Sequence, residues 1–192
     1  YDDQPRTQDL GVGAVVMAAG TEVFDPAKLD TYLYTQLPNV VTSLEFERIL
    51  SASGPYRGRL MRPYDREEPA KIAWLQCVGS RNMNESDNPY CSAVCCMYAI
   101  KEAVIAKEHA HAPLDAAIFY MDIRTHGKDF ERYYERAKEH GVRFSRSRVH
   151  SLTPVANGNM EISYVDDSGT IASEVFILVV LSVGVQASKE TA

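Results

Sequence analysis

The four cysteines of this chain lie close together in the sequence and are the residues best suited to chemistry. Cys77, Cys91, Cys95 and Cys96 give the pattern C-x13-C-x3-C-C within a chain of 192 residues. Four thiolates can bind a structural zinc ion or an iron–sulfur cube. Small buried hydrophobes are the alternative explanation, but cysteines of the hydrophobic core would rarely fall so near one another. The sequence therefore favours a metal or redox site.

The spacing favours a [4Fe-4S] cluster over one zinc ion. Structural zinc sites usually draw on paired C-x2-C segments, and this chain has none. The adjacent Cys95 and Cys96 point in different directions, which suits the separate corners of a cube. Two alternatives stay open: a zinc-stabilised structural or interaction domain, and a metal-free dithiol–disulfide oxidoreductase domain. The second would pair Cys91 with Cys95, which stand four residues apart and would share one face of a helix.

The elements predicted around the cysteines would hold them at the end of a strand and the start of a helix. Residues 71–78 form a short apolar run that ends with Cys77 near Gly79, typical of a buried strand. Residues 91–109 are rich in helix formers, with Cys91 at the junction and Cys95 and Cys96 in the first turn. The partial positive charge of a helix N-terminus would favour thiolates there.

The rest of the chain predicts an α/β fold. Helices are expected at 43–52, with Ser43 as N-cap and Leu44, Ile49 and Leu50 facing inward, and at 128–140. Further strands are expected at 12–19, 116–123, 142–149, 160–165, 171–176 and 176–183. Alternating strands and helices imply parallel pairing. We expect a three-layer, dinucleotide-binding-type (Rossmann-like, FAD/NAD(P)-binding-domain-like) parallel sheet with a small antiparallel β meander. The expected division is 1–52 as a flavin-domain-like part, 53–70 as linker, 71–184 as the cysteine-bearing domain and 185–192 as tail.

Composition narrows the class of protein. The net charge of −6 argues against a nucleic-acid partner. No apolar stretch approaches the length of a membrane span, and residues 1–10 lack the features of a signal peptide, so a cytoplasmic location is expected. Because the first residue is Tyr1 and an apolar run follows soon after, we expect the chain to be an internal part of a longer protein.

Several segments resemble the A subunit of heterodisulfide reductase and its bacterial relatives. They are "AVVMAAGTEVFDP" (14–26), "IAWLQCVGSRN" (72–82), "YCSAVCCMYAIKEA" (90–103), "IFYMDIRTHGKDFERYYERAKEHGVRF" (118–144) and "LVVLSVG" (178–184). The resemblance implies a thioredoxin-reductase-like flavoprotein in which Cys77, Cys91, Cys95 and Cys96 bind a [4Fe-4S] cluster. The cluster would relay electrons between FAD and partner subunits of a disulfide (heterodisulfide) reductase.

The resemblance also sets expectations for the other groups. Only Gly79 remains of the glycine motif that binds a nicotinamide cofactor, so NAD(P) binding is not expected. No flavin glycine loop or ferredoxin motif is present, and the chain alone is not expected to be active or to bind FAD. FAD contacts in the full-length protein are expected at Ala19, Gly20, Thr21 and Gly184. No residue is expected to act on substrate covalently.

Partners and nearby charges complete the expectations. Other heterodisulfide-reductase-type subunits, electron-donor proteins or a second copy of the chain are the expected partners. Arg81, Lys101 and Arg124 are the cations that could tune a cluster potential, although ordinary surface charge also explains them.

Overall fold

The computed structural model describes residues 4–83 and 88–188. Its centre is a five-stranded, wholly parallel sheet with the strand order β2-β9-β3-β4-β5. The strands are β2 (Val40–Thr42), β3 (Lys71–Val78), β4 (Asp115–Phe119), β5 (Arg143–Ser145) and β9 (Leu178–Val183). The expected parallel α/β sheet is therefore confirmed, and the expected strand 71–78 has the predicted bounds.

Helices cover one face of the sheet. They are α1 (Ser43–Leu50), α2 (Cys95–His109) and α3 (Phe130–Glu139). Their buried side chains pack with those of alternate strand positions, such as Ile72, Trp74 and Ile118, in one apolar cluster. The ring of Phe46 meets Trp74 edge-on with 5.4 Å between centroids. Because strand side chains alternate between faces, the intervening residues are free to form a second core.

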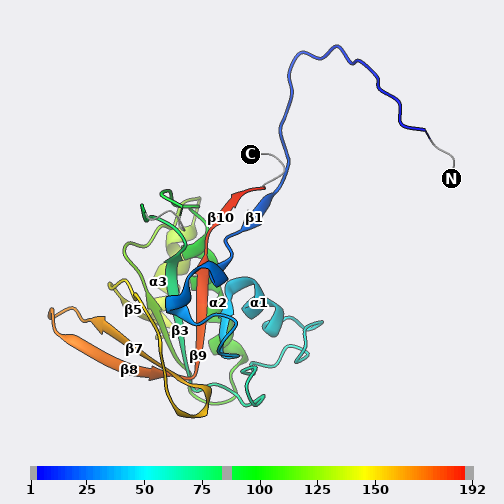
Figure 1. Cartoon of the computed structure of the whole chain (residues 1–192). Helices are drawn as coiled ribbons and strands as arrows, with labels where there is room; N and C mark the ends of the chain where they lie inside the picture. Colours follow the sequence, from blue (N-terminus) through cyan, green and yellow to red (C-terminus); the bar gives the residue numbers. More distant parts are fainter. Residues whose placement is uncertain (1–3, 84–87, 189–192) are drawn as a thin grey trace.

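That second core lies under an antiparallel meander. Its strands are β6 (Thr153–Pro154), β7 (Met160–Val165) and β8 (Ile171–Phe176). Ala73, Leu75 and Phe119 of the central sheet pack there against Ile162 and Phe176. Helices, parallel sheet and meander thus form three layers (Figure 1).

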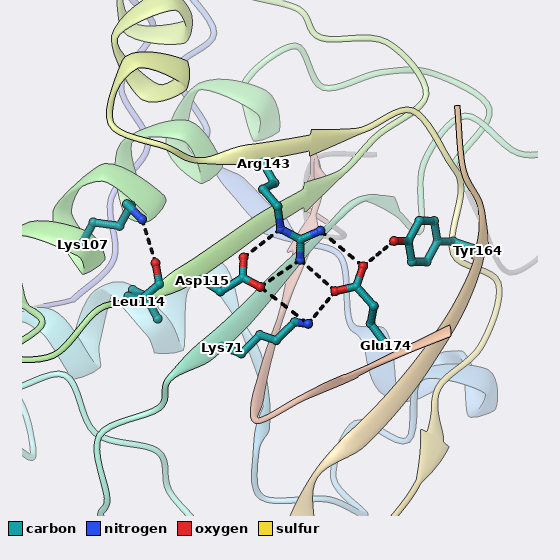
Figure 2. A network of polar contacts seen from close by, with 7 residues as sticks. All are labelled: Lys71, Lys107, Leu114, Asp115, Arg143, Tyr164 and Glu174. Carbon is teal, nitrogen blue, oxygen red and sulfur yellow. Dashed lines mark hydrogen bonds and ion pairs between the residues drawn. The ribbon is translucent and has the colours of Figure 1, made fainter. Parts of the chain in front are cut away.

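A polar network ties the meander to the amino ends of the parallel strands (Figure 2). Arg143 at the start of β5 donates to Asp115 at the start of β4 and to Glu174 of β8, with Nε–Oδ1 and Nη2–Oε2 distances of 2.8 and 2.9 Å. Lys71 bridges the same two carboxylates, and the Tyr164 hydroxyl donates to Glu174. The network lies at the opposite end of β3 from Cys77.

The prediction of a buried strand at 12–19 is wrong. Residues 4–20 are extended and exposed, and they run away from the body of the molecule (Figure 1). The strand that forms is β1 (Thr21–Val23), which pairs antiparallel with β10 (Val185–Ala187). Val15, Val16 and Met17 are at least 74% exposed. An apolar run becomes a buried strand only where its backbone can form hydrogen bonds with a neighbouring strand, and no described strand lies beside this one.

Element boundaries differ elsewhere because of local capping. Thr42, not Ser43, caps α1 in a capping box with Glu45, and Leu44 is 61% exposed instead of buried. The helix predicted from residue 91 begins at Cys95, because Ala93 has a positive φ of 59°. Residues 84–87, within a polar stretch that follows Arg81, lie outside the described part. In that part, no helix is long and apolar enough to cross a membrane.

Candidate metal centre

The four cysteines line one pocket at the carboxyl end of the parallel sheet. Three of them, Cys77, Cys95 and Cys96, are buried, and Cys91 is half-buried. Residues of the loops after β3 and β4 complete the wall: Ser80, Arg81, Ser92, Ala93, Val94, Asp122 and Arg124. The sequence places these cysteines on three separate elements, and the fold brings all four to one place. Carboxyl ends of parallel strands are where α/β sheets commonly bind ligands.

Cys77 is positioned by a bulge in β3. The register of β3 against β9 shifts between Leu75 and Val78, so that β3 contains one more residue than its partner there. Within this bulge Cys77 has a φ of 62°, in the left-handed region that non-glycine residues rarely adopt. A bulge redirects a side chain out of the regular alternation of a strand. The Cys77 thiol thereby joins the pocket.

The segment before α2 positions the other three thiols. The N–H of Ala93 donates to Cys91 Sγ at 3.3 Å. Cys95 and Cys96 occupy the first turn of α2, where the helix dipole favours negative charge. Cys95 Sγ lies 3.2 Å from Ser92 Oγ and donates to Val183 O at 3.4 Å.

Two arginines and one aspartate line the cysteine pocket beside the thiols. Arg81 forms an ion pair with Asp122, and Arg124 Nε lies 3.2 Å from the same carboxylate. Arg81 also lies close to Cys77, and its positive charge favours the thiolate form. Lys101 is exposed on α2 and does not line the pocket. Of the three cations considered from sequence, two therefore lie at the site. Asp122, which the sequence did not single out, holds both of them.

Burial disfavours the ionised form of two of the thiols. Desolvation raises the pKa of Cys77, although Arg81 opposes this effect, and it raises the pKa of Cys96 to about 11. These thiols are therefore neutral near pH 7, and a cationic group that binds them must displace their protons.

The donor set fits an iron–sulfur cluster. All four thiols are free, and they reach one pocket from a strand bulge, a loop and a helix N-terminus. They do not gather around a single point. In residues 4–83 and 88–188, no group of three or more His, Cys, Asp or Glu side chains is placed to hold one metal ion.

The expected flavin contacts lie in two places. Ala19 and Gly20 are exposed in the extended segment, and Thr21 pairs with Ala187 in the β1–β10 ribbon. Gly184 lies at the root of that ribbon, where its carbonyl accepts from the Phe24 N–H at 2.9 Å. A Cβ on Gly184 would stand 2.4 Å from Ser80 Oγ, so this glycine adjoins the cysteine pocket.

Fold and site together define an α/β domain with a four-cysteine centre, and sequence comparison relates it to one enzyme family. No family model matches the chain. Over 96% of its length it is 42% identical to an iron–sulfur A subunit of the CoB–CoM heterodisulfide reductase of Methanopyrus kandleri. It is 39% identical, over 99% of its length, to the A subunit of the H2/formate:CoB–CoM heterodisulfide,ferredoxin reductase of Methanococcus maripaludis. The chain spans 28% and 29% of these two relatives. The resemblance to the A subunit of heterodisulfide reductase is thus confirmed along nearly the whole chain.

Proposed function

We propose that Cys77, Cys91, Cys95 and Cys96 hold a [4Fe-4S] cluster, and that the chain is an electron-transfer segment of a flavin- and iron–sulfur-dependent heterodisulfide reductase. The observation that carries the proposal is the convergence of all four free thiols on one pocket. The Methanopyrus relative is named an iron–sulfur subunit, which supports the proposal. A bound cluster would supply one-electron chemistry.

The protein's own residues would set the conditions for that chemistry. The bulge at Cys77 and the first turn of α2 fix the thiols on rigid elements. The N–H of Ala93 donates to Cys91 Sγ, and the positive charge of Arg81 lies close to Cys77. Hydrogen bonds and positive charge at cluster sulfurs raise the reduction potential. Burial of Cys77, Cys95 and Cys96 excludes water from most of the site.

The fold also supports the assignment of a more specific fold type. We infer a Rossmann-like, FAD/NAD(P)-binding-domain type because a parallel sheet lies between helices and a meander, with the site at its carboxyl edge. In the full-length protein, electrons would pass between this site and FAD held near Ala19, Gly20, Thr21 and Gly184, and on to partner subunits. We also propose that residues 71–184 are the cysteine-bearing domain. Strand β2 pairs with its sheet, and side chains of α1 pack in its core.

Serine replacement of each cysteine tests the ligand set. The chain is produced and purified without oxygen, and iron and sulfide are measured for wild type and for Cys77→Ser, Cys91→Ser, Cys95→Ser and Cys96→Ser. We expect each variant to lose most of its iron or to show a changed EPR spectrum. Ser163→Ala, an exposed change on the meander, serves as the control. Full iron and an unchanged spectrum in any cysteine variant would remove that residue from the ligand set.

A further inference from the structure

A hydroxyl group lies directly beside the sulfur of Cys95. Ser92 Oγ stands 3.2 Å from Cys95 Sγ, and both side chains line the cysteine pocket. Ser92 precedes the first residue of α2, which is Cys95. Between them Ala93 has a positive φ of 59°, which turns the backbone. This turn before the helix brings the hydroxyl and the sulfur to the same side of the pocket.

The second contact of Cys95 fixes the direction of this hydrogen bond. A thiol has one proton, and Cys95 Sγ donates it to the carbonyl of Val183 at 3.4 Å. The Ser92 hydroxyl is therefore the donor, and Cys95 Sγ is its acceptor. The serine thus already gives a hydrogen bond to one of the proposed ligand atoms.

The same contacts suit a Cys95 that is bound to iron. A cysteine that binds a metal is a thiolate, so its sulfur has no proton to give and can only accept. The Val183 carbonyl keeps a donor in that state, because the Tyr98 hydroxyl on the next turn of α2 also donates to it. The hydrogen bond from Ser92 needs no rearrangement when the Cys95 proton leaves.

Gly184 leaves space for this hydroxyl and for a second one. A Cβ on Gly184 would stand 3.1 Å from Ser92 Oγ and 2.4 Å from Ser80 Oγ. Ser80 lines the same pocket, but its buried Oγ has no hydrogen-bond partner among the described residues. The two serines are therefore neighbours that differ in one respect, the contact with a cysteine sulfur.

We propose that Ser92 is a positioning residue that raises the reduction potential of the cluster through its hydrogen bond to Cys95. Its role rests on the proposed function, because the hydroxyl acts on a cluster that Cys95 helps to hold. A donor at a ligand sulfur stabilises the reduced state, which carries the additional negative charge, more than the oxidised state. Ser92 acts through Cys95 and does not itself bind iron.

A redox titration of the anaerobically purified chain, followed by EPR, measures the effect. Ser92→Ala removes the hydroxyl and should retain full iron and sulfide. We expect its equilibrium constant for reduction to be about three- to tenfold smaller, a shift of roughly 30–60 mV to more negative potential at about 59 mV per tenfold. Ser92→Thr retains a hydroxyl and should restore most of the potential.

Ser80→Ala is the matched control. It removes a hydroxyl from the same pocket, but one without a partner among the described residues, and should leave the potential unchanged. An equal shift in Ser80→Ala would overturn the proposal, because lost polarity and not the hydrogen bond to Cys95 would then be the cause. An unchanged or more positive potential in Ser92→Ala would overturn it as well.

Pulsed EPR after exchange into D2O reports on the hydrogen bond itself. The Ser92 hydroxyl should give the reduced cluster an exchangeable deuteron coupling that is present in wild type and Ser92→Thr and lost in Ser92→Ala. The Ala93 N–H, which donates to Cys91 Sγ, remains in all three proteins and serves as an internal reference. Identical deuteron spectra in wild type and Ser92→Ala would contradict the proposal.

Iron analysis separates failure of the proposed function from failure of the role of Ser92. A folded wild-type chain without iron would overturn both. A complete cluster whose potential and deuteron spectrum do not respond to Ser92→Ala would overturn the role of Ser92 alone. Loss of iron in Ser92→Ala with full iron in Ser92→Thr would show that the hydroxyl also holds Cys95 in place, in support of the proposal, whereas loss of iron in both variants would overturn it.

Discussion

Arg81 forms an ion pair with Asp122 across the wall of the cysteine pocket. The pair joins the loop after β3 to the segment after β4, and each partner also contacts a cysteine. Arg81 lies close to the Cys77 thiol, while the backbone carbonyl of Asp122 accepts from Cys96 Sγ at 3.8 Å. A single ion pair thus connects the surroundings of two proposed ligands that come from different elements.

Replacing Arg81 should lower the reduction potential of the proposed cluster. Arg81→Gln removes a positive charge beside Cys77, and the reduced form, which carries the additional negative charge, loses more stabilisation than the oxidised form. We expect a shift of tens of millivolts to more negative values, where roughly 59 mV is tenfold in a one-electron equilibrium. A redox titration followed by EPR measures it. Arg132→Gln, on the exposed face of α3, serves as the control and should leave the potential unchanged. An unchanged or more positive potential in Arg81→Gln would contradict the assignment.

Gly79 should tolerate no side chain. It has a φ of +69°, and a Cβ there would stand 2.2 Å from the ring of Phe24. Gly79→Ala should lower the free energy of unfolding by more than about 2 kcal/mol, because backbone strain and steric overlap add. Gly169 is a matched control, with a φ of +84° and open space around it; Gly169→Ala should cost only about 1 kcal/mol. Chemical denaturation compares the two, and equal losses would show that the Phe24 contact is unimportant.

The network of Figure 2 should make stability depend on acid pH. Hydrogen bonds from Lys71, Tyr164 and Arg143 outweigh burial and lower the pKa of Glu174 from 4.5 to about 2. Since the folded state favours the ionised form, this contribution is complete above about pH 4.5 and is lost as the pH falls toward 2. Glu174→Gln should destabilise the chain by roughly 1–3 kcal/mol at neutral pH and by much less near pH 2.

Thermal or urea unfolding at several pH values measures that difference. Glu161→Gln, on the neighbouring strand β7, controls for the loss of one carboxylate outside the network. If Glu174→Gln lost the same stability at pH 2 as at pH 7, the ionised carboxylate would not be the source of the stabilisation.

Much of the fold could be predicted because apolar patterns of the sequence match layers that the chain itself supplies. The run 71–78 is buried on both faces between β4 and β9, and the alternation at 160–165 suits a strand with one covered face. The apolar run 12–19 has the same local signal, yet no described strand lies beside it. Hydrophobicity indicates that a segment can be buried, whereas burial itself needs a partner.

The residues of the site could be predicted from the sequence, but their arrangement in space could not. The cluster of four cysteines can be seen from the sequence alone. The bulge and the positive φ at Cys77, in contrast, depend on how β3 pairs with β9. Asp122 had no local signal, because its role follows from two loops that meet only in the fold. Ser92 had the pattern of an ordinary polar loop residue, and only the turn before α2 reveals its hydroxyl beside Cys95 Sγ.

Iron and acid-labile sulfide analysis of the anaerobically purified wild-type chain, with zinc measured in the same sample and EPR after reduction, tests the central claim most directly. The account predicts about four irons and four sulfides per chain, little zinc, and a signal from a reduced [4Fe-4S] cluster. A colourless, folded protein with one zinc ion per chain and no iron would contradict it.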